Sequence, residues 1–340
     1  MTSRDRVVLT LNHQPVDRIA RDLRVSSEMK LYHGDEVGEM QFRFASDMIK
    51  ALLRWPRGER SRGKSREPGD HTDAWGCTWH VPKRGAIGAL VDSPLADPAA
   101  IAGYRPPLEI LERADLSTVN ERCAGTSRFA LAWSQTKPLE RLQALRGPGA
   151  ALADLGAGDA GARRLLDMLH EFSCREMEMW AQSDVDGVVF SDDWGSPDGL
   201  IVSPDVFRDF FKPLYGQYCE ILHAHDKYAF FRSDGDITEI FGDLVDLGID
   251  AVAAQWFAMD FEALAREYRG RVTFWGELDR LRLMPLGTPE QVRAAVRRLQ
   301  RALDFGRGGV IAACEWGAAT PFTNVAAMFE QWQQPLPIHA

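Results

Sequence analysis

The stretch that decides the fold is Tyr228-Ala-Phe-Phe-Arg232-Ser-Asp234-Gly235, a short apolar run that ends abruptly in charged residues. Five other runs end in the same way, at 129–134, 187–195, 251–256, 272–279 and 310–316. Apolar runs of this length are typical of strands buried on both faces, as in a parallel sheet, and most are followed by a helical pattern. The alternation predicts an α/β fold, a (β/α)8 TIM barrel, whose active site lies at the carboxyl ends of the strands.

Local signals support the crossover helices of such a barrel. Ser203-Pro204-Asp205 combines an N-cap serine with a proline in the first turn, and Pro213 should kink or break the helix that follows. Thr288 and Gln291 have the spacing of a capping box. We also expect a short helix over 3–13 and a first strand over 18–24.

Bulk composition excludes several classes of protein. The 340 residues carry a formal charge of −9, which argues against a general nucleic-acid binder. The five cysteines contain no CxxC pair, so a reducing, cytoplasmic location is the simpler expectation. No apolar run reaches the length of a membrane span, and no signal segment is recognisable.

The chain reads as one domain, 1–340, with an N-terminal elaboration over 1–125 and the main run of βα units over 126–340. A basic loop over 54–67 holds six Lys/Arg residues between Arg54 and Arg66. It is either a solvated, mobile loop or a basic lid over an anionic substrate. The stretch 73–92 predicts a hairpin that decorates the barrel.

Several motifs together resemble the uroporphyrinogen decarboxylase and corrinoid-methyltransferase superfamily. They are Ser191-Asp-Asp-Trp-Gly195, Leu200-Ile-Val-Ser-Pro204, Phe210-Phe-Lys-Pro213, Ser233-Asp-Gly-Asp236, Phe274-Trp-Gly-Glu-Leu-Asp279 and Leu286-Gly-Thr-Pro-Glu290. The opening 11–18 is similar to the start of these proteins. The resemblance covers nearly the whole chain and implies a (β/α)8 barrel of the uroporphyrinogen decarboxylase type.

The chain departs from both known branches of this superfamily. It lacks the Met-Arg-Gln-Ala-Gly-Arg-Tyr signature of true uroporphyrinogen decarboxylases. The corrinoid-linked methyltransferases bind zinc through His-x-Cys and a later Cys, and the matching positions here are Arg232, Asp234 and Cys314. The resemblance therefore implies a mixed zinc site of Asp234 and Cys314, joined by Glu277 or Glu315. The alternative is that Cys314 is a small core residue and Asp234 a helix cap.

The candidates for catalysis are Asp192, Asp193, Arg232 and Glu277. Asp192 and Asp193 are adjacent, so their side chains should point to opposite sides of the strand end, and one of them would face the barrel axis as acid or base. Arg232 either pairs with Asp192, Asp193 or Glu277, or holds a substrate anion through its bidentate fork.

Aromatic side chains mark the same strand ends. Either they cover the barrel top, or they form an aromatic pocket for a flat ring or a cation. The predicted substrate-binding residues are Trp133, Trp194, Gln255, Trp256, Trp275 and Trp316, with Trp75 from the hairpin.

The sequence thus predicts a methyltransferase-like enzyme that acts on a small methylated or aromatic molecule, with zinc and a separate corrinoid protein as expected helpers. A homodimer is compatible with the sequence. One alternative is a cofactor-free decarboxylase of a tetrapyrrole-like acid, and another is a non-catalytic binding or scaffold barrel.

Overall fold

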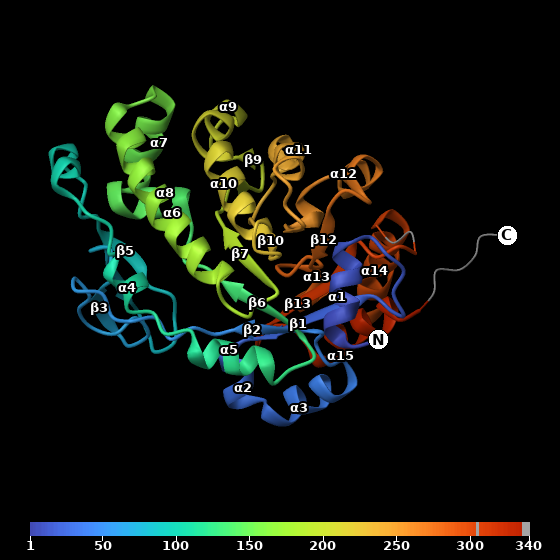
Figure 1. The fold of residues 1–340 in the computed structure, drawn as a ribbon. Helices are drawn as coiled ribbons and strands as arrows, with labels where there is room; N and C mark the ends of the chain where they lie inside the picture. The colour runs from blue at the N-terminus through green and yellow to red at the C-terminus, as the bar shows by residue number, and fades with distance from the viewer. Residues whose placement is uncertain (304–305, 335–340) are drawn as a thin grey trace.

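Eight parallel strands form the centre of the molecule and define a nearly closed TIM barrel (Figure 1). The structure, a computed structural model, describes residues 1–303 and 306–334. The hydrogen-bonded order of the strands is β1-β13-β12-β11-β10-β7-β6-β2. Their bounds are β1 (Ala20–Val25), β2 (Met48–Ala51), β6 (Phe129–Trp133), β7 (Gly187–Ser191), β10 (Tyr228–Arg232), β11 (Ala251–Ala253), β12 (Thr273–Gly276) and β13 (Val310–Trp316).

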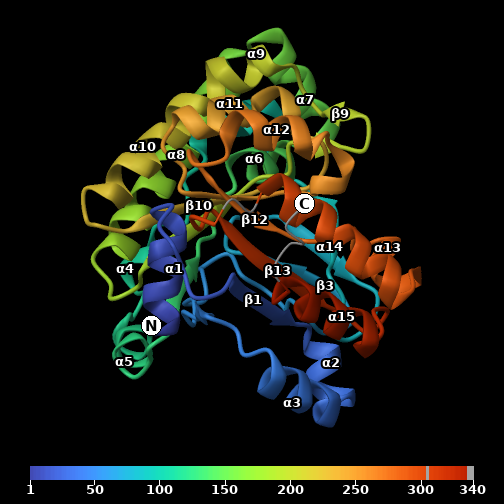
Figure 2. The ribbon, with the colours of Figure 1, turned by 90° about the vertical axis from the view of Figure 1, so that its right-hand side faces the viewer.

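Helices cover the strands, and short elements decorate the barrel. The helices are α1 (Ser3–Leu11), α2 (Ser27–Tyr32), α3 (Gly34–Arg43), η1 (Pro98–Gly103), α4 (Glu109–Glu112), α5 (Ser117–Ala124), α6 (Pro138–Arg146), α7 (Pro148–Ala157), α8 (Ala160–Ala181), α9 (Pro204–Val206), η2 (Phe207–Phe211), α10 (Lys212–His223), α11 (Thr238–Asp246), η3 (Trp256–Ala258), α12 (Phe261–Tyr268), α13 (Leu283–Leu286), α14 (Pro289–Leu303) and α15 (Phe322–Trp332). In Figure 2, α2 and α3 lie together beyond β1. Among the described residues, no helix has the length and apolar character to cross a membrane.

Alternate side chains of each strand belong to two different cores. On β13, Ile311 and Ala313 pack inside the barrel, whereas Ala312, Cys314 and Trp316 pack outward against the helices. The same alternation holds on β10, where Phe230 lies inside the barrel. Because side chains alternate along a strand, the next inward position on β10 is Arg232 and the next on β13 is Glu315. The inward series on each strand therefore decides which residues reach the mouth.

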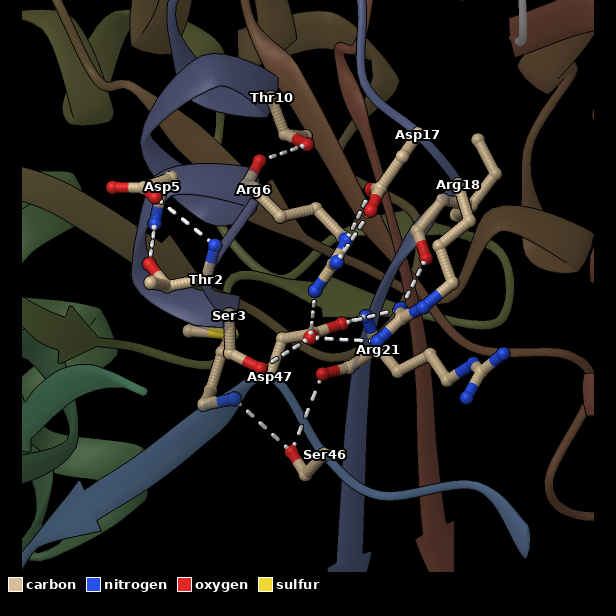
Figure 3. A network of polar contacts seen from close by, with 12 residues as sticks. Thr2, Ser3, Asp5, Arg6, Thr10, Asp17, Arg18, Arg21, Ser46 and Asp47 are labelled. Atoms are coloured by element: carbon tan, nitrogen blue, oxygen red, sulfur yellow. Dashed lines mark hydrogen bonds and ion pairs between the residues drawn. The ribbon is translucent and has the colours of Figure 1, made fainter. Parts of the chain in front are cut away.

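Helix α1 closes the end of the barrel opposite the mouth. Its Val7 and Leu11 are buried with the side chains of the barrel interior. Beside it, the buried carboxylate of Asp47 accepts hydrogen bonds from Ser3, from Arg6 at 2.6 Å and from Arg18 at 2.6 and 2.8 Å (Figure 3). Burial alone would raise the pKa of Asp47, but these partners outweigh it and lower the pKa. Since active sites of TIM barrels lie at the other end, we assign this network to stability.

The barrel is incomplete between β1 and β2, the two edge strands of the sheet. At the base they are tied by the Asp47 amide, which donates to the Arg21 carbonyl at 2.9 Å, and by Ser46, which donates to the same carbonyl at 3.2 Å. No ladder joins the described residues of these two strands farther along. The side of the barrel is therefore open between β1 and β2.

The strands predicted from the apolar runs are confirmed, and so is the first strand. The predicted helix over 3–13 is α1, and the Thr288–Gln291 capping box forms through hydrogen bonds of 2.8 and 3.3 Å. The predicted break before Pro213 takes the form of the π-helical η2, a local defect that accommodates the missing amide of proline. Strand β2 has the sequence Met-Ile-Lys-Ala, which is too short and too polar to stand out as an apolar run.

The first 125 residues do more than decorate the barrel, because they supply β1 and β2. The predicted hairpin is β4 (Thr78–Val81) with β5 (Ala89–Asp92), and β3 (Gly69–Thr72) makes it a three-stranded sheet. A two-stranded connection, β8 (Gly195–Ser196) with β9 (Gly199–Leu200), follows β7.

The basic loop 54–67 is held by its own contacts, such as the hydrogen bonds that Arg62 donates to the Glu59 and Ser61 carbonyls at 2.7 and 2.9 Å. Residues 304–305 and 335–340 of the predicted barrel range lie outside the described residues.

Candidate active site

Six charged side chains at the barrel mouth form a closed cycle of alternating sign, which we call the charge ring: Arg24, Glu277, Arg280, Asp234, Arg232 and Glu315. Arg24 contacts Glu277 closely, and Arg280 contacts Asp234 closely. The other four links are long: 3.9 Å for Glu277–Arg280, 3.6 Å for Asp234–Arg232, 3.8 Å for Arg232–Glu315 and 3.7 Å for Glu315–Arg24. The ring comes from β1, β10, β13 and the segments after β10 and β12.

Arg24 is the most heavily engaged member of the charge ring. Its guanidinium also lies 3.2 Å from Asp22 and stacks over the rings of Trp133 and Trp275, at 5.7 and 5.4 Å from their centroids. Burial would lower the pKa of Arg24, but Asp22, Glu277 and Glu315 together raise it. This cation therefore stays charged and holds the surrounding carboxylates in position.

Asp22 is a buried carboxyl group below the charge ring. It accepts a hydrogen bond from Trp275 Nε1 at 2.9 Å. Burial raises the pKa of Asp22 in spite of the opposing effects of Arg24 and Trp275. A carboxyl group whose protonated form is favoured in this way can donate a proton at a pH where an exposed aspartate cannot.

A cleft of about 570 Å³ follows the open side of the barrel between β1 and β2 and ends at the charge ring. Cations outnumber acids among its described lining residues: Arg24, Lys30, Lys50, Arg122, Arg128 and Arg232 against Asp22 and Glu315. Arg24 and Arg232 are paired within the ring, but the other four cations form no ion pair with a described residue. The cleft is therefore positively charged and suited to an anionic ligand.

One wall of the cleft is aromatic. Trp133 lies at the end of β6 and packs edge-on against Trp275, with 6.1 Å between their centroids. The ammonium of Lys50 lies 4.7 Å from the centre of the Trp133 ring. Burial, and then the neighbouring Arg24, lowers the pKa of Lys50. A flat or apolar group could therefore lie against Trp133 while an acidic group meets Lys50 and Arg232.

Asp192 does not face the barrel axis. Its carboxylate is fully buried outside the strands, where it accepts hydrogen bonds from the Leu139 and Glu140 amides at 2.8 and 2.9 Å. It also accepts a hydrogen bond from the Tyr215 hydroxyl at 2.6 Å. Burial raises the pKa of Asp192 to about 7. Asp192 thus caps the first turn of α6 and does not line the charge ring or the cleft.

Asp193 is exposed and also acts on the backbone, because it accepts a hydrogen bond from the Asp234 amide at 3.1 Å. This contact joins the segments that follow β7 and β10. The two segments approach so closely at Gly195 and Gly235 that a Cβ on Gly235 would lie 2.1 Å from the Gly195 carbonyl carbon. Gly235 also has a φ of +77°, which side chains rarely adopt. The two segments are therefore fixed relative to each other.

The predicted zinc ligands do not form a metal site. Asp234 and Glu277 belong to the charge ring, where each contacts arginine, whereas Cys314 points outward into the core between β13 and the helices. Burial, and then the nearby Glu277, raises the pKa of the Cys314 thiol. Among residues 1–303 and 306–334, no group of three His, Cys, Asp or Glu side chains could hold a metal. These residues do not fit zinc, because cations occupy the carboxylates and the thiol faces away.

The predicted tryptophans divide between the two faces of the strands. Trp133 and Trp275 are inside the barrel. Trp75, Trp194, Trp256 and Trp316 are buried in the outer core, where Trp75 packs against Phe172 of α8. Gln255 and Trp256 line a second cavity on the opposite side of the charge ring.

Arg232 forms ion pairs, as one of its two interpretations predicted. Its partners are Asp234 and Glu315, however, and not Asp192, Asp193 or Glu277. The sequence reasoning missed Asp22, Arg24, Lys50 and Arg280. A signal was present for Asp22 and Arg24. They occupy alternate positions of β1 after Ala20, which lies inside the barrel, so their side chains should point inward as well.

The chain is similar to one protein family and to several solved structures. The profile of the family described as "Uroporphyrinogen decarboxylase (URO-D)" matches residues 73–334. A methyltransferase from Methanosarcina mazei has a similar structure, with a TM-score of 0.72 and 16% identity over 98% of each chain. An endo-β-1,4-xylanase from Gloeophyllum trabeum aligns with a TM-score of 0.47 and 8% identity, over 95% of this chain and 99% of the other. No curated protein sequence matches the chain.

Proposed function

The chain belongs to the uroporphyrinogen decarboxylase family, and from this premise we propose that it is a methyltransferase-like enzyme for a small methylated organic acid. The observation that carries the proposal is the cationic cleft at the barrel mouth. Its lining also includes the buried carboxyl of Asp22 and the aromatic ring of Trp133. The structural similarity to a methyltransferase supports the reaction class.

Arg232 is the cation best suited to bind the carboxylate of the substrate. Both of its ion pairs are long, 3.6 Å to Asp234 and 3.8 Å to Glu315, so it can turn towards a ligand at little cost. Lys50 lines the same cleft and forms no ion pair with a described residue. A carboxylate held by two cations is stabilised in the ground state, so it anchors the substrate and is not the group that reacts.

Asp22 would supply the proton that the reaction needs. When a methyl group leaves an oxygen or nitrogen of the substrate, the bond breaks, the heteroatom keeps the electron pair and then takes a proton. Asp22 lines the cleft, and its raised pKa favours the form that can donate this proton. Arg24 holds the residue in place. A corrinoid carried by a separate protein would supply the nucleophile that accepts the methyl group.

The test separates binding from chemistry. We expect 4-methoxybenzoate to bind and its uncharged analogue 4-methoxytoluene to bind far more weakly, as measured by calorimetry. Arg232→Gln should weaken binding of the acid about 10- to 100-fold, because a hydrogen bond to a charged group is lost, and should leave the analogue unaffected. Arg271→Gln is the matched control, because Arg271 forms an exposed ion pair with Asp246 away from the mouth. Equal effects on acid and analogue would contradict the proposal.

Decarboxylation is the second candidate, favoured by the surplus of cations in the cleft, which could hold a second carboxylate while the first leaves as CO₂. The carbon that loses CO₂ keeps the electron pair and would take a proton from Asp22. Incubation of methoxylated mono- and dicarboxylic acids with the protein and cob(I)alamin distinguishes the reactions. Formation of the demethylated acid supports methyl transfer. Release of CO₂ without demethylation supports the second candidate instead.

A further inference from the structure

The second cavity lies across the charge ring from the cleft and has a different character. Its volume is about 270 Å³, and it is bounded by η3, by the segment 277–282 after β12 and by Pro197. Its apolar lining includes Trp256, Phe257, Leu278 and Leu281. An apolar cavity of about 150 Å³ suffices for benzene, so this one can hold a substituted aromatic ring. We call it the apolar pocket.

The apolar pocket adjoins the candidate active site. Glu277 and Arg280 line the pocket and are also members of the charge ring, whose other side is formed by Arg24, Arg232 and Glu315 of the cleft. The link between Glu277 and Arg280 is the longest in the ring, at 3.9 Å. The ring is therefore a shared wall, and it is weakest where the apolar pocket meets it.

The lining of the apolar pocket includes a large apolar side chain that is exposed to solvent. Leu281 is 69% exposed, although the Asp279 carboxylate fixes its segment by accepting hydrogen bonds from the Leu281 and Arg282 amides, each at 2.9 Å. Trp256 is wholly buried, and its Nε1 donor has no hydrogen-bond partner among the described residues. A ligand with an apolar body would cover the exposed Leu281 side chain and remove its apolar surface from water. The Trp256 Nε1 packs beside Gly276, away from the lining of the pocket, so it would not take part in binding.

We propose that the apolar pocket is a second substrate subsite, which binds the aromatic or other apolar end of the same acid whose carboxylate lies in the cleft. The inference rests on the proposed function and narrows the substrate class to an acid with a bulky apolar substituent. The reacting bond then lies between the two ends, at the charge ring and above Asp22.

The experiment compares two probes, 4-methoxybenzoate and its 3-benzyl derivative. With the wild-type protein the benzyl group should strengthen binding about tenfold or more, since several buried carbons contribute. Leu281→Asp should reduce this gain to about threefold or less without changing the affinity for 4-methoxybenzoate. Leu286→Asp is the matched control, because Leu286 is 81% exposed on the nearby α13 and does not line the pocket.

Ala258→Trp gives a second and independent test, because Ala258 is exposed at the rim and a larger side chain there fills the pocket. It should abolish the gain from the benzyl group in the same way. If the benzyl group gives no gain in the wild type, or if Leu281→Asp and Leu286→Asp reduce it equally, the subsite is refuted. If 4-methoxybenzoate itself does not bind, the proposed function has failed and not the subsite alone.

Discussion

Replacement of Arg24 by methionine tests whether the charge ring is an integral part of the fold. Methionine keeps an apolar side chain against Trp133 and Trp275 but removes the charge that faces Asp22 and Glu277. These two carboxylates are only 9% and 16% exposed. Removing one partner of a buried ion pair costs about 3–5 kcal/mol, because the other charge is left without compensation. We expect Arg24→Met to lower the free energy of unfolding by about this amount.

The assay is urea-induced unfolding followed by tryptophan fluorescence and circular dichroism. Arg271→Met is the control, since Arg271 and Asp246 are 53% and 61% exposed and such pairs contribute at most about 1 kcal/mol. Adding Glu277→Gln to Arg24→Met should restore part of the loss, about 1–3 kcal/mol, because the orphaned charge is removed. If Arg24→Met costs no more than the control, the electrostatic account of the ring is refuted.

Three further predictions concern residues around the mouth. The pKa of Asp192 is raised from 3.8 to about 7, so the folded state binds the proton of this carboxyl more tightly than the unfolded state does. Asp192 should therefore lower the free energy of unfolding by about 1.4 kcal/mol per pH unit as the pH rises from about 4 to 7. Asp192→Asn should remove that part of the slope in unfolding measured across this range, and an unchanged slope would contradict the assignment. Gly235→Ala should cost about 2–4 kcal/mol in urea unfolding, because it combines overpacking against Gly195 with a positive φ. Gly199→Ala is the control for the strain alone, because Gly199 also has a positive φ but no atom lies within 4 Å of a Cβ there. Cys314→Ala should leave the zinc content of the purified protein and its response to added zinc unchanged, and loss of stoichiometric zinc in this variant would show that the thiol is a ligand.

The barrel strands could be predicted from the sequence because each is an uninterrupted apolar run. The same feature leaves open which side chains point into the barrel and which point outward to the helices. In Gly187-Val-Val-Phe-Ser191 both faces are buried, so no alternation of polar and apolar residues distinguishes inside from outside. For this reason the sequence could not tell that Asp192 points outward, nor that Cys314 does, whereas Arg232 and Glu315 point to the mouth.

Three of the four residues that were missed, Asp22, Arg24 and Lys50, belong to the two strands whose sequences are least apolar, and the fourth, Arg280, follows β12. Ala20–Val25 contains three charged residues and Met48–Ala51 contains Lys50, because these strands border the open side of the barrel and are partly in contact with the cleft. The charge ring itself joins residues up to 291 positions apart, Arg24 and Glu315, and it depends on the register that pairs them across β1 and β13. No local pattern contains that register, so only the folded arrangement reveals the ring.

The ring also explains how arginine at position 232 is compatible with an active site. An unpaired guanidinium at the mouth would be costly, and a tightly paired one could not bind a substrate. Arg232 is in neither state, since its two partners lie at 3.6 and 3.8 Å. Glu315 is the most exposed acid of the ring, at 47%, so it can move into water more easily than Asp234 or Glu277. We expect a substrate carboxylate to replace Glu315 beside Arg232, so that one anion is exchanged for another and the charge balance of the mouth is preserved.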